Sequence, residues 1–319
     1  MSARKLIFIL LLFCSCNPYR FASRHVTGKV EKAGLSLHTA RMEKYTINYW
    51  DSQEDKPVLL LIHGLGADTE FHWYKQVGEL KDYRIIMPNL LYFGGSVPEN
   101  DNYSVIGQVR AMQALIKELG LKEFYLCGFS YGGLVAAELA KAETGKVKKL
   151  LLFDAPVKYF VREDLQPLLH KYGLKEPSQL LVPKDAKAMK DLTSVIYKHP
   201  PHIPAAFYKS FQVNMYQENE EQYTRILRKM ESERAYFETQ DYKFHFPVLL
   251  LWGEDDVMVP SSVGKMLQEH IGSNARFVVI PGTAHVPNLE KPHAFNKYML
   301  DFLKENSAGQ DAPGTVSNN

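Results

Sequence analysis

Cysteine is scarce in this sequence, and neither sign of charge dominates it. Only three of the 319 residues are cysteines, Cys14, Cys16 and Cys127, which excludes a disulfide framework within a folded domain. The formal net charge is +2, which argues against a nucleic-acid-binding surface. No cluster of histidine, cysteine and acidic residues has the spacing of a metal site, and no glycine-rich phosphate loop occurs. We therefore expect no metal, no cofactor and no nucleic-acid partner.

The N-terminal stretch has the features of an export signal. The basic pair Arg4-Lys5 precedes an apolar run over residues 6–13. Those eight residues are too few to span a bilayer as a helix, which favours a cleaved signal over a permanent anchor. The ending, with Ser15 before Cys16, resembles the signal of bacterial lipoproteins, and Cys14 is a second candidate. This resemblance implies lipid attachment at Cys16 and an exported, membrane-anchored protein; the alternative is a plain signal and a secreted or periplasmic protein.

Apolar runs and helical patterns alternate along most of the chain. The continuous apolar run over residues 57–62 is typical of a strand that is buried on both faces of a parallel sheet. Further strands are predicted at 45–50, 83–87, 123–127, 147–153, 246–252 and 275–280, with helices at about 69–80, 104–119, 134–141, 261–271 and 292–304. This order predicts an α/β fold whose mostly parallel central sheet is covered by helices on both faces.

The alternation stops between residues 155 and 243, where the composition predicts short helices that form an inserted cap. The expected organisation is a leader over 1–16, a tether over 17–26, the first part of the core over 27–154, the helical cap over 155–243, the second part of the core over 244–304 and a disordered tail over 305–319. Nine side chains of the cap could line a pocket, although for any one of them packing of the cap on the sheet is favoured: Tyr159, Phe160, Tyr172, Met189, Tyr197, Phe207, Phe211, Met215 and Tyr216.

The stretch Gly128-Phe129-Ser130-Tyr131-Gly132-Gly133 lies between a predicted strand and a predicted helix. It fits the G-x-S-x-G pattern of a nucleophile elbow. The flanking glycines are expected because a side chain at those positions would clash where the strand folds tightly onto the helix. The pattern predicts that Ser130 presents its hydroxyl at the positive end of the helix. In the alternative, Ser130 only caps the helix.

A serine nucleophile needs a base within hydrogen-bond reach, and the base needs an acid that orients it. When the elbow comes first, the acid and then the histidine follow along the chain. Asp255 and Asp256 follow the strand predicted at 246–252, and His285 follows the next strand. Catalytic groups of such folds lie at the C-terminal ends of parallel strands. Ser130, Asp256 and His285 therefore fit a catalytic triad in order, spacing and context.

With these motifs the chain resembles the α/β-hydrolase superfamily from about residue 45 to residue 304. The matching segments are His63-Gly64 after a strand, the elbow at Ser130, the acid loop at 253–260 and the histidine loop at 282–292. In the family the acid lies three residues after the glycine of its loop and four before the proline. This resemblance implies Asp256 as the acid.

The resemblance also implies roles for neighbouring residues. Asp255 is the fallback acid, and Asp154, whose position holds the acid in some relatives, is expected to be structural. The backbone N–H groups of Leu65 and Tyr131 are expected to form the oxyanion hole. His63 is expected to brace the oxyanion loop rather than to act as a base. The loop over residues 89–96 departs from the family's Asp-x-Pro-Gly-x-Gly-x-Ser pattern, so an unusual pocket edge is expected.

A serine at the elbow excludes the aspartate-based dehalogenases and epoxide hydrolases that share this fold. Hydrolysis of carboxylic esters through an acyl-enzyme is the simplest remaining chemistry. Residues 181–189 and 198–204 resemble the cap of monoacylglycerol lipases and of some bacterial lipases. This implies medium or long acyl esters, such as monoacylglycerols, as substrates at a membrane surface. The alternatives are hydrolysis of a carbon–carbon bond in a dienoic diketone and a non-catalytic, hydrolase-like binding protein.

Overall fold

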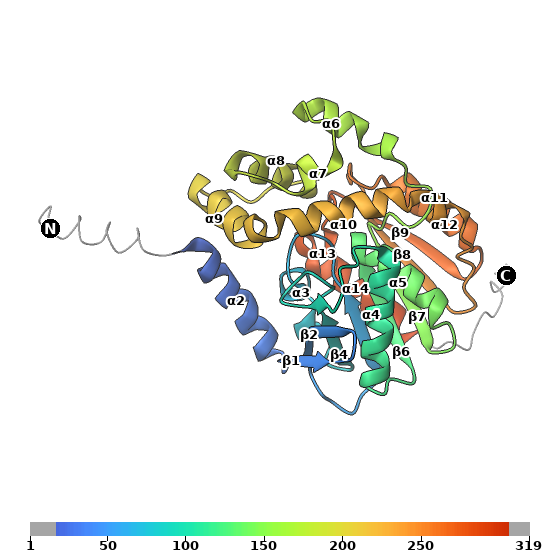
Figure 1. Ribbon diagram of the computed structural model, residues 1–319. Helices are drawn as coiled ribbons and strands as arrows, with labels where there is room; N and C mark the ends of the chain where they lie inside the picture. Colours follow the sequence, from blue (N-terminus) through green and yellow to red (C-terminus); the bar gives the residue numbers. More distant parts are fainter. Residues whose placement is uncertain (1–16, 306–319) are drawn as a thin grey trace, which may run out of the picture.

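The computed structural model describes residues 17–305 as a central sheet with helices packed around it (Figure 1). The leader predicted over 1–16, including Cys16, and residues 306–319 of the predicted tail lie outside the described residues. Within the described part of the chain, no helix combines the length and the apolar character needed to cross a membrane.

One nine-stranded sheet forms the centre of the fold, in the order β1-β2-β4-β3-β6-β7-β8-β9 with β5 paired to β2. Its strands are β1 (Ser36–Arg41), β2 (Tyr45–Asp51), β3 (Val58–Ile62), β4 (Arg84–Pro88), β5 (Val97–Pro98), β6 (Phe124–Phe129), β7 (Val147–Phe153), β8 (Val248–Gly253) and β9 (Ala275–Ile280). The pairs β1/β2, β2/β4 and β2/β5 are antiparallel, and every pair from β4 to β9 is parallel. The predicted, mostly parallel α/β fold is confirmed.

Helices cover both faces of the sheet, which explains the continuous apolar runs of its central strands. Leu60 and Ile62 of β3 pack into the core under α4 (Val105–Glu118), α5 (Ser130–Ala142) and α12 (Ser261–Ile271). Leu59 and Leu61 point to the opposite face, which is covered by α2 (Pro18–Lys32), α3 (Thr69–Trp73), η1 (Val77–Glu79) and α14 (Pro292–Lys304). In Figure 1, α4 and α5 lie in front of the sheet and α14 lies behind it.

The chain between β7 and β8, where the cap is predicted, contains helices and connecting loops and no strand. The helices are η2 (Arg162–Leu165), α6 (Gln166–Tyr172), α7 (Pro177–Leu181), α8 (Ala186–Ile196), α9 (Ala205–Met215), η3 (Gln217–Asn219), α10 (Glu220–Ser232) and α11 (Arg234–Thr239). The short helix α13 (Pro287–Glu290) follows β9 and precedes α14. Figure 1 shows α10 lying between helices α6, α7 and α8 and the sheet, with α9 and α11 at its two ends, so α10 forms much of the roof over the strand ends.

The tether predicted over residues 17–26 is wrong, because this segment is the first half of helix α2. The Asn17 side chain caps the helix by accepting hydrogen bonds from the N–H groups of Tyr19 and Arg20, at 3.0 and 3.3 Å. Val26 and Val30, four residues apart, bury one stripe of the helix. The basic residues of this stretch lie on the exposed face, so its polar composition concealed the narrow apolar stripe.

Helix α2 also connects the core to the cap. The Tyr19 ring lies 5.7 Å from the Phe71 ring of α3 and 5.6 Å from the Phe211 ring of α9. Ser210 of α9 donates a 2.7 Å hydrogen bond to the Asn17 carboxamide. These contacts hold α9 beside the N-terminal end of α2, so the cap is fixed from a segment that precedes the sheet.

Candidate active site

Strand β6 turns directly into helix α5 at Ser130, whose φ of 50° lies in the left-handed region. The turn is possible only without side chains at two positions. A Cβ on Gly128 would lie 2.7 Å from the Gly132 carbonyl oxygen, and a Cβ on Gly132 would lie 2.0 Å from the His63 carbonyl oxygen. The backbone therefore presents Ser130 at the N-terminus of α5, where the helix dipole favours negative charge.

The structure brings Ser130, Asp256 and His285 together from the ends of three different strands. His285 Nε2 lies 2.9 Å from Ser130 Oγ, and His285 Nδ1 lies 2.8 Å from Asp256 Oδ2. Because the carboxylate can only accept, Nδ1 carries the hydrogen and Nε2 is free to accept the serine proton. Both His285 and Asp256 are buried, at 3% and 5% exposed. This arrangement can move a proton from the serine hydroxyl to the imidazole.

The loop after β8 holds the Asp256 carboxylate in place. Its Oδ1 accepts the backbone N–H groups of Met258 and Val259 at 2.8 and 3.1 Å, which leaves Oδ2 directed at His285. Asp255, the fallback acid, does not face the histidine: its Oδ1 lies 2.7 Å from Lys198 Nζ of the cap. Of these two neighbouring carboxylates, only Asp256 orients the imidazole.

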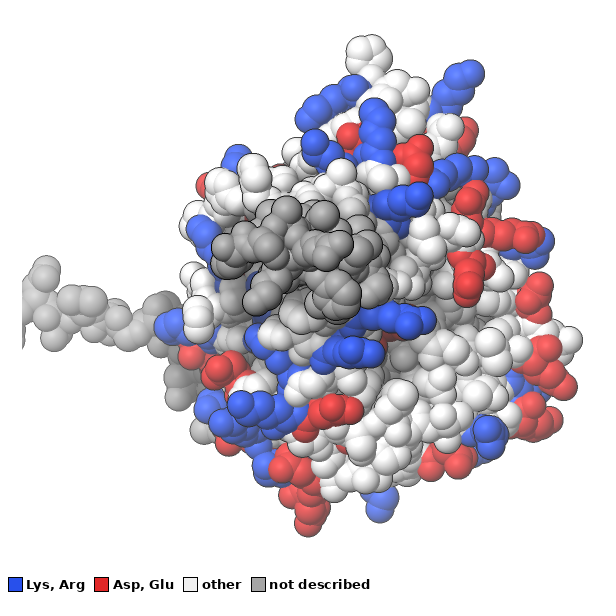
Figure 2. Space-filling model, turned by 90° about the vertical axis from the view of Figure 1, so that its left-hand side faces the viewer, with Lys and Arg blue, Asp and Glu red and all other residues white. Residues whose placement is uncertain are grey.

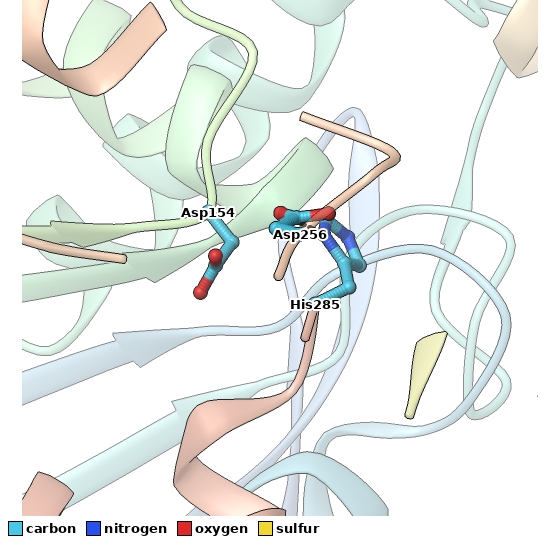
Figure 3. Close-up of side chains that lie close together, drawn as sticks. All are labelled: Asp154, Asp256 and His285. Atoms are coloured by element: carbon cyan, nitrogen blue, oxygen red, sulfur yellow. Dashed lines mark hydrogen bonds and ion pairs between the residues drawn. The ribbon is translucent and has the colours of Figure 1, made fainter. Parts of the chain in front are cut away.

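Asp154, the other candidate acid, follows strand β7 directly and lies close to this pair. Figure 3 shows it beside Asp256 and His285, and these residues offer ligand atoms within 4.8 Å of one another. This spacing would suit a metal ion, but Nδ1 of His285 and Oδ2 of Asp256 are hydrogen-bonded to each other and Nε2 faces Ser130. The donor set therefore fits a proton relay better than a cation site.

Glu290 of α13 is a residue of the site that the sequence reasoning missed. Its Oε1 accepts the Ala284 N–H, next to His285, at 2.7 Å. Its Oε2 accepts the N–H groups of Lys198 and His199 in the cap at 2.9 and 3.2 Å. One carboxylate thus joins the histidine loop to the cap. The only signal in the sequence is an acidic residue five positions after the histidine, inside the loop that already matched the family.

The predicted oxyanion donors lie at the same place. Leu65 and Tyr131 line the cavity that contains Ser130 and His285. The Tyr131 N–H belongs to the first turn of α5, where a helix offers it no internal partner. The Tyr131 N–H is therefore available to an oxyanion formed at Ser130, and the donor role of Leu65 stays a prediction.

His63 braces the segment that carries Leu65. Its Nε2 accepts the Leu90 N–H at 2.9 Å, so Nδ1 carries the hydrogen and donates to the Gly64 carbonyl at 2.7 Å. Complete burial lowers the pKa of His63 to about 4, so the ring is neutral near pH 7. The hydrogen bond from Leu90 comes from the loop over 89–96 that departs from the family pattern, and this loop still supports the site.

A cavity of about 390 Å³ extends from Ser130 into the cap, and its lining is mostly apolar. The apolar lining residues are Leu65, Phe129, Tyr131, Pro156, Phe160, Val161, Leu165, Pro177, Leu181, Leu192, Ile196, Tyr216, Leu227, Met230, Met258, Val259 and Val286. Of the nine cap side chains considered from the sequence, only Phe160 and Tyr216 line it. The apolar part of the lining comes mostly from leucine, isoleucine, valine and methionine side chains, and those of the cap are oriented by how its helices pack.

His72 also lines this cavity and carries no sequence motif. It is buried, and its Nε2 has no hydrogen-bond partner among residues 17–305. Burial first, and then the nearby His63, hold the pKa of His72 well below its ordinary value. The ring therefore adds a neutral polar edge to a mostly apolar wall.

The chain matches a known family. The sequence matches the family model of the alpha/beta hydrolase fold over residues 57–292, and the chain belongs to this family. Lipase 3 of Moraxella sp. (strain TA144) is 28% identical over 267 residues, which are 82% of this chain and 81% of the lipase. Epoxide hydrolase 3 of Xenopus tropicalis is 26% identical over 274 residues, 78% of this chain and 72% of the relative.

The solved structures are similar in fold. A membrane phospholipase A, described as a novel bacterial virulence factor, aligns with a TM-score of 0.79 at 24% identity and covers 95% of this chain and 98% of its own. Together with the lipase relative, the family match identifies an alpha/beta hydrolase with lipase-like and esterase-like homologues, which supports ester hydrolysis as its general activity.

The close approach at the elbow predicts a large cost for a single methyl group. Gly132→Ala places Cβ 2.0 Å from the rigid His63 carbonyl oxygen, so we expect a loss of stability of about 3 kcal/mol or more. Gly28→Ala is the control, because a Cβ there meets nothing within 4 Å inside helix α2 and should stabilise the protein slightly. Thermal unfolding measures both variants. A Gly132→Ala protein as stable as the original would contradict the described turn.

The two adjacent aspartates should differ sharply in importance. Asp256→Ala removes the acceptor of the His285 Nδ1–H, so kcat on a simple ester should fall by roughly 10⁴-fold. Asp255→Ala removes only the contact with Lys198, and its kcat should stay within about threefold of the original, as expected for an exposed ion pair. The reverse ranking in a steady-state ester assay would assign the acid role to Asp255.

Proposed function

We propose that this protein is a serine ester hydrolase of lipase or esterase type, which cleaves medium-to-long acyl esters such as monoacylglycerols. The observation that carries the proposal is the hydrogen-bonded series Ser130, His285 and Asp256 at the base of an apolar cavity. A cavity of about 390 Å³ is in the size range of small-molecule sites. Its mostly apolar lining suits an acyl chain better than a charged substrate.

The reaction follows from these positions. His285 Nε2 accepts the proton of Ser130 as Oγ bonds to the ester carbonyl carbon, and the carbonyl oxygen takes the electron pair. The N–H groups of Leu65 and Tyr131 stabilise this oxyanion. When the tetrahedral intermediate collapses, the bond to the alcohol oxygen breaks, and His285 returns the proton to that oxygen. Water then repeats both steps on the acyl-enzyme, which releases the acid and restores Ser130.

The epoxide hydrolase relatives suggest a different reaction on the same fold. The elbow residue decides against it, because an aspartate-based enzyme needs a carboxylate nucleophile and the elbow of this chain holds Ser130. A carbon–carbon bond hydrolase would use the same serine elbow, and a binding protein would need no elbow. The fold therefore does not distinguish these two alternatives from an ester hydrolase, and experiments are needed to do so.

A panel of esters with increasing acyl length tests the substrate class. We expect kcat/KM to rise from acetate to medium or long acyl esters and to include a monoacylglycerol, because each buried methylene adds about 0.8 kcal/mol. Leu192→Trp, in the cavity wall on α8, should shift the optimum to shorter chains while short esters keep their rate.

Ser130→Ala is the control for all turnover in this panel. Equal rates on short soluble esters with none on monoacylglycerols would contradict the lipid substrate. Turnover of a dienoic diketone without any ester hydrolysis would instead favour the carbon–carbon bond hydrolase.

We also propose that the protein is exported and held at a membrane by a lipid on Cys16. Helix α2 begins two residues later and supports this placement: it carries Arg20, Arg24, Lys29 and Lys32 against a single acid, Glu31. Its Phe21 side chain is 73% exposed. Figure 2 faces the side on which α2 lies in Figure 1, and it shows Lys and Arg side chains on this side with some Asp and Glu side chains among them. A basic surface with an exposed aromatic side chain suits anionic lipid headgroups.

The anchor predicts a specific response to single thiol substitutions in the full chain. Cys16→Ser should move the protein from the membrane fraction to the soluble fraction and abolish incorporation of a labelled fatty acid. Cys14→Ser, two residues away, should change neither result. Membrane recovery and labelling that survive Cys16→Ser and vanish in Cys14→Ser would move the attachment to Cys14, and their survival in both variants would contradict a lipid anchor.

A further inference from the structure

Asp154 is a carboxyl group that the proposed reaction does not use, although it is completely buried beside the relay. It follows β7 directly, and its φ of 47° lies in the left-handed region, which is uncommon for a residue with a side chain. Its side chain and the side chains of Asp256 and His285 offer ligand atoms within 4.8 Å of one another (Figure 3). An isolated buried carboxylate is costly, so its protonation state has to be explained.

The hydrogen bonds divide unequally between the two aspartates. Asp256 receives N–H groups from Met258, Val259 and His285, so both of its oxygens are satisfied as acceptors. Asp154 Oδ1 receives one, from the Gly253 backbone at 2.9 Å. Asp154 Oδ2 has no donor among the described residues. The negative charge of the pair is therefore stabilised on Asp256 and not on Asp154.

A proton on Asp154 removes this imbalance. Two buried carboxyl groups this close cannot both ionise at ordinary cost, and the Glu290 carboxylate adds a further negative charge. Burial first, then the charge of Asp256 and a hydrogen bond to it, raise the pKa of Asp154 well above its ordinary value, while the Gly253 N–H acts in the opposite direction. When Asp154 is protonated it carries no negative charge, so its Oδ2 needs no donor and its O–H can donate a hydrogen bond instead.

We propose that Asp154 is held protonated and acts as a positioning residue for the relay. Its Oδ1 fixes the N–H of Gly253, the last residue of β8 and three positions before Asp256, and its carboxyl group lies within 4.8 Å of the Asp256 carboxylate. The pair then presents one negative charge to His285 rather than two. The catalytic consequence rests on the proposed serine mechanism, whereas the protonation state does not.

Two substitutions of Asp154 test whether its side chain acts as a neutral acid or as a carboxylate anion. Asp154→Asn keeps an acceptor for Gly253 and a neutral donor toward Asp256, so kcat/KM on an ester should stay within about threefold of the original. Asp154→Ala removes both groups and loosens the acid loop, and kcat should fall roughly ten- to hundredfold with little change in KM. A collapse of activity in Asp154→Asn would show that Asp154 works as an anion, and full activity in Asp154→Ala would show that it positions nothing.

The pH dependence of stability reports the proton directly. An unfolded aspartate ionises near pH 4, whereas the folded Asp154 has a raised pKa, so its stabilising contribution is complete below about pH 4 and is lost as pH rises toward the folded pKa. The carboxamide introduced by Asp154→Asn does not titrate. The melting temperature of Asp154→Asn minus that of the original should therefore increase as pH rises from about 4 to 8. A constant or decreasing difference would contradict the proposal.

Asp51→Asn is the matched control for the loss of a buried carboxylate. Asp51 is 1% exposed and accepts hydrogen bonds from the Arg84 guanidinium at 3.0 and 2.6 Å, so its substitution should destabilise the protein near neutral pH. If the original protein hydrolysed no ester at all, the proposed function would fail. The melting-temperature difference between Asp154→Asn and the original would still decide the protonation of Asp154.

Discussion

The site depends on two close backbone contacts, each of which requires a glycine because a side chain would not fit. At the first, Gly132 of α5 passes beneath the His63 carbonyl, and a Cβ would lie 2.0 Å from its oxygen. At the second, Gly253 passes beneath the Ala284 carbonyl, and a Cβ would lie 1.9 Å from its oxygen. These crossings bring the elbow, the oxyanion segment, the acid loop and the histidine loop within hydrogen-bond reach of one another. Side chains from distant parts of the sequence can meet only because these backbones touch.

The cap is tied to the same loops rather than resting on them. Glu290 bonds the histidine loop to residues 198 and 199, and Lys198 pairs with Asp255 beside the acid. The Tyr216 hydroxyl lies where a Cβ on Gly66 would point. The cap therefore also contacts the segment that follows His63 and carries Leu65. The same contacts therefore hold both the cavity wall and the loops that carry the reacting groups. Removal of the Glu290 carboxylate, which bonds to both the cap and the histidine loop, is therefore expected to affect both substrate fit and the position of His285.

The parallel core and the meeting of Ser130, His285 and Asp256 could be predicted from the sequence for a physical reason. Strands buried on both faces must be continuously apolar, and the elbow must carry glycines, so both leave local marks such as the apolar run of β3 and the motif around Ser130. The tether was a misinterpretation, because only Val26 and Val30 marked the buried stripe of α2. The roles of Glu290, His72 and the cavity-lining leucines depend on contacts between segments far apart in the chain, which leave no local pattern.

Mass spectrometry of the covalent adduct tests the central claim, that Ser130 is a nucleophile activated by His285 and Asp256. The folded full-length protein would be treated with a fluorophosphonate, and the modified peptide would be sequenced. The account predicts one adduct, on Ser130, with labelling lost in Ser130→Ala and strongly slowed when His285 is replaced by alanine. Ester turnover that persists in Ser130→Ala, or an adduct on another residue that accounts for the loss of activity, would contradict it.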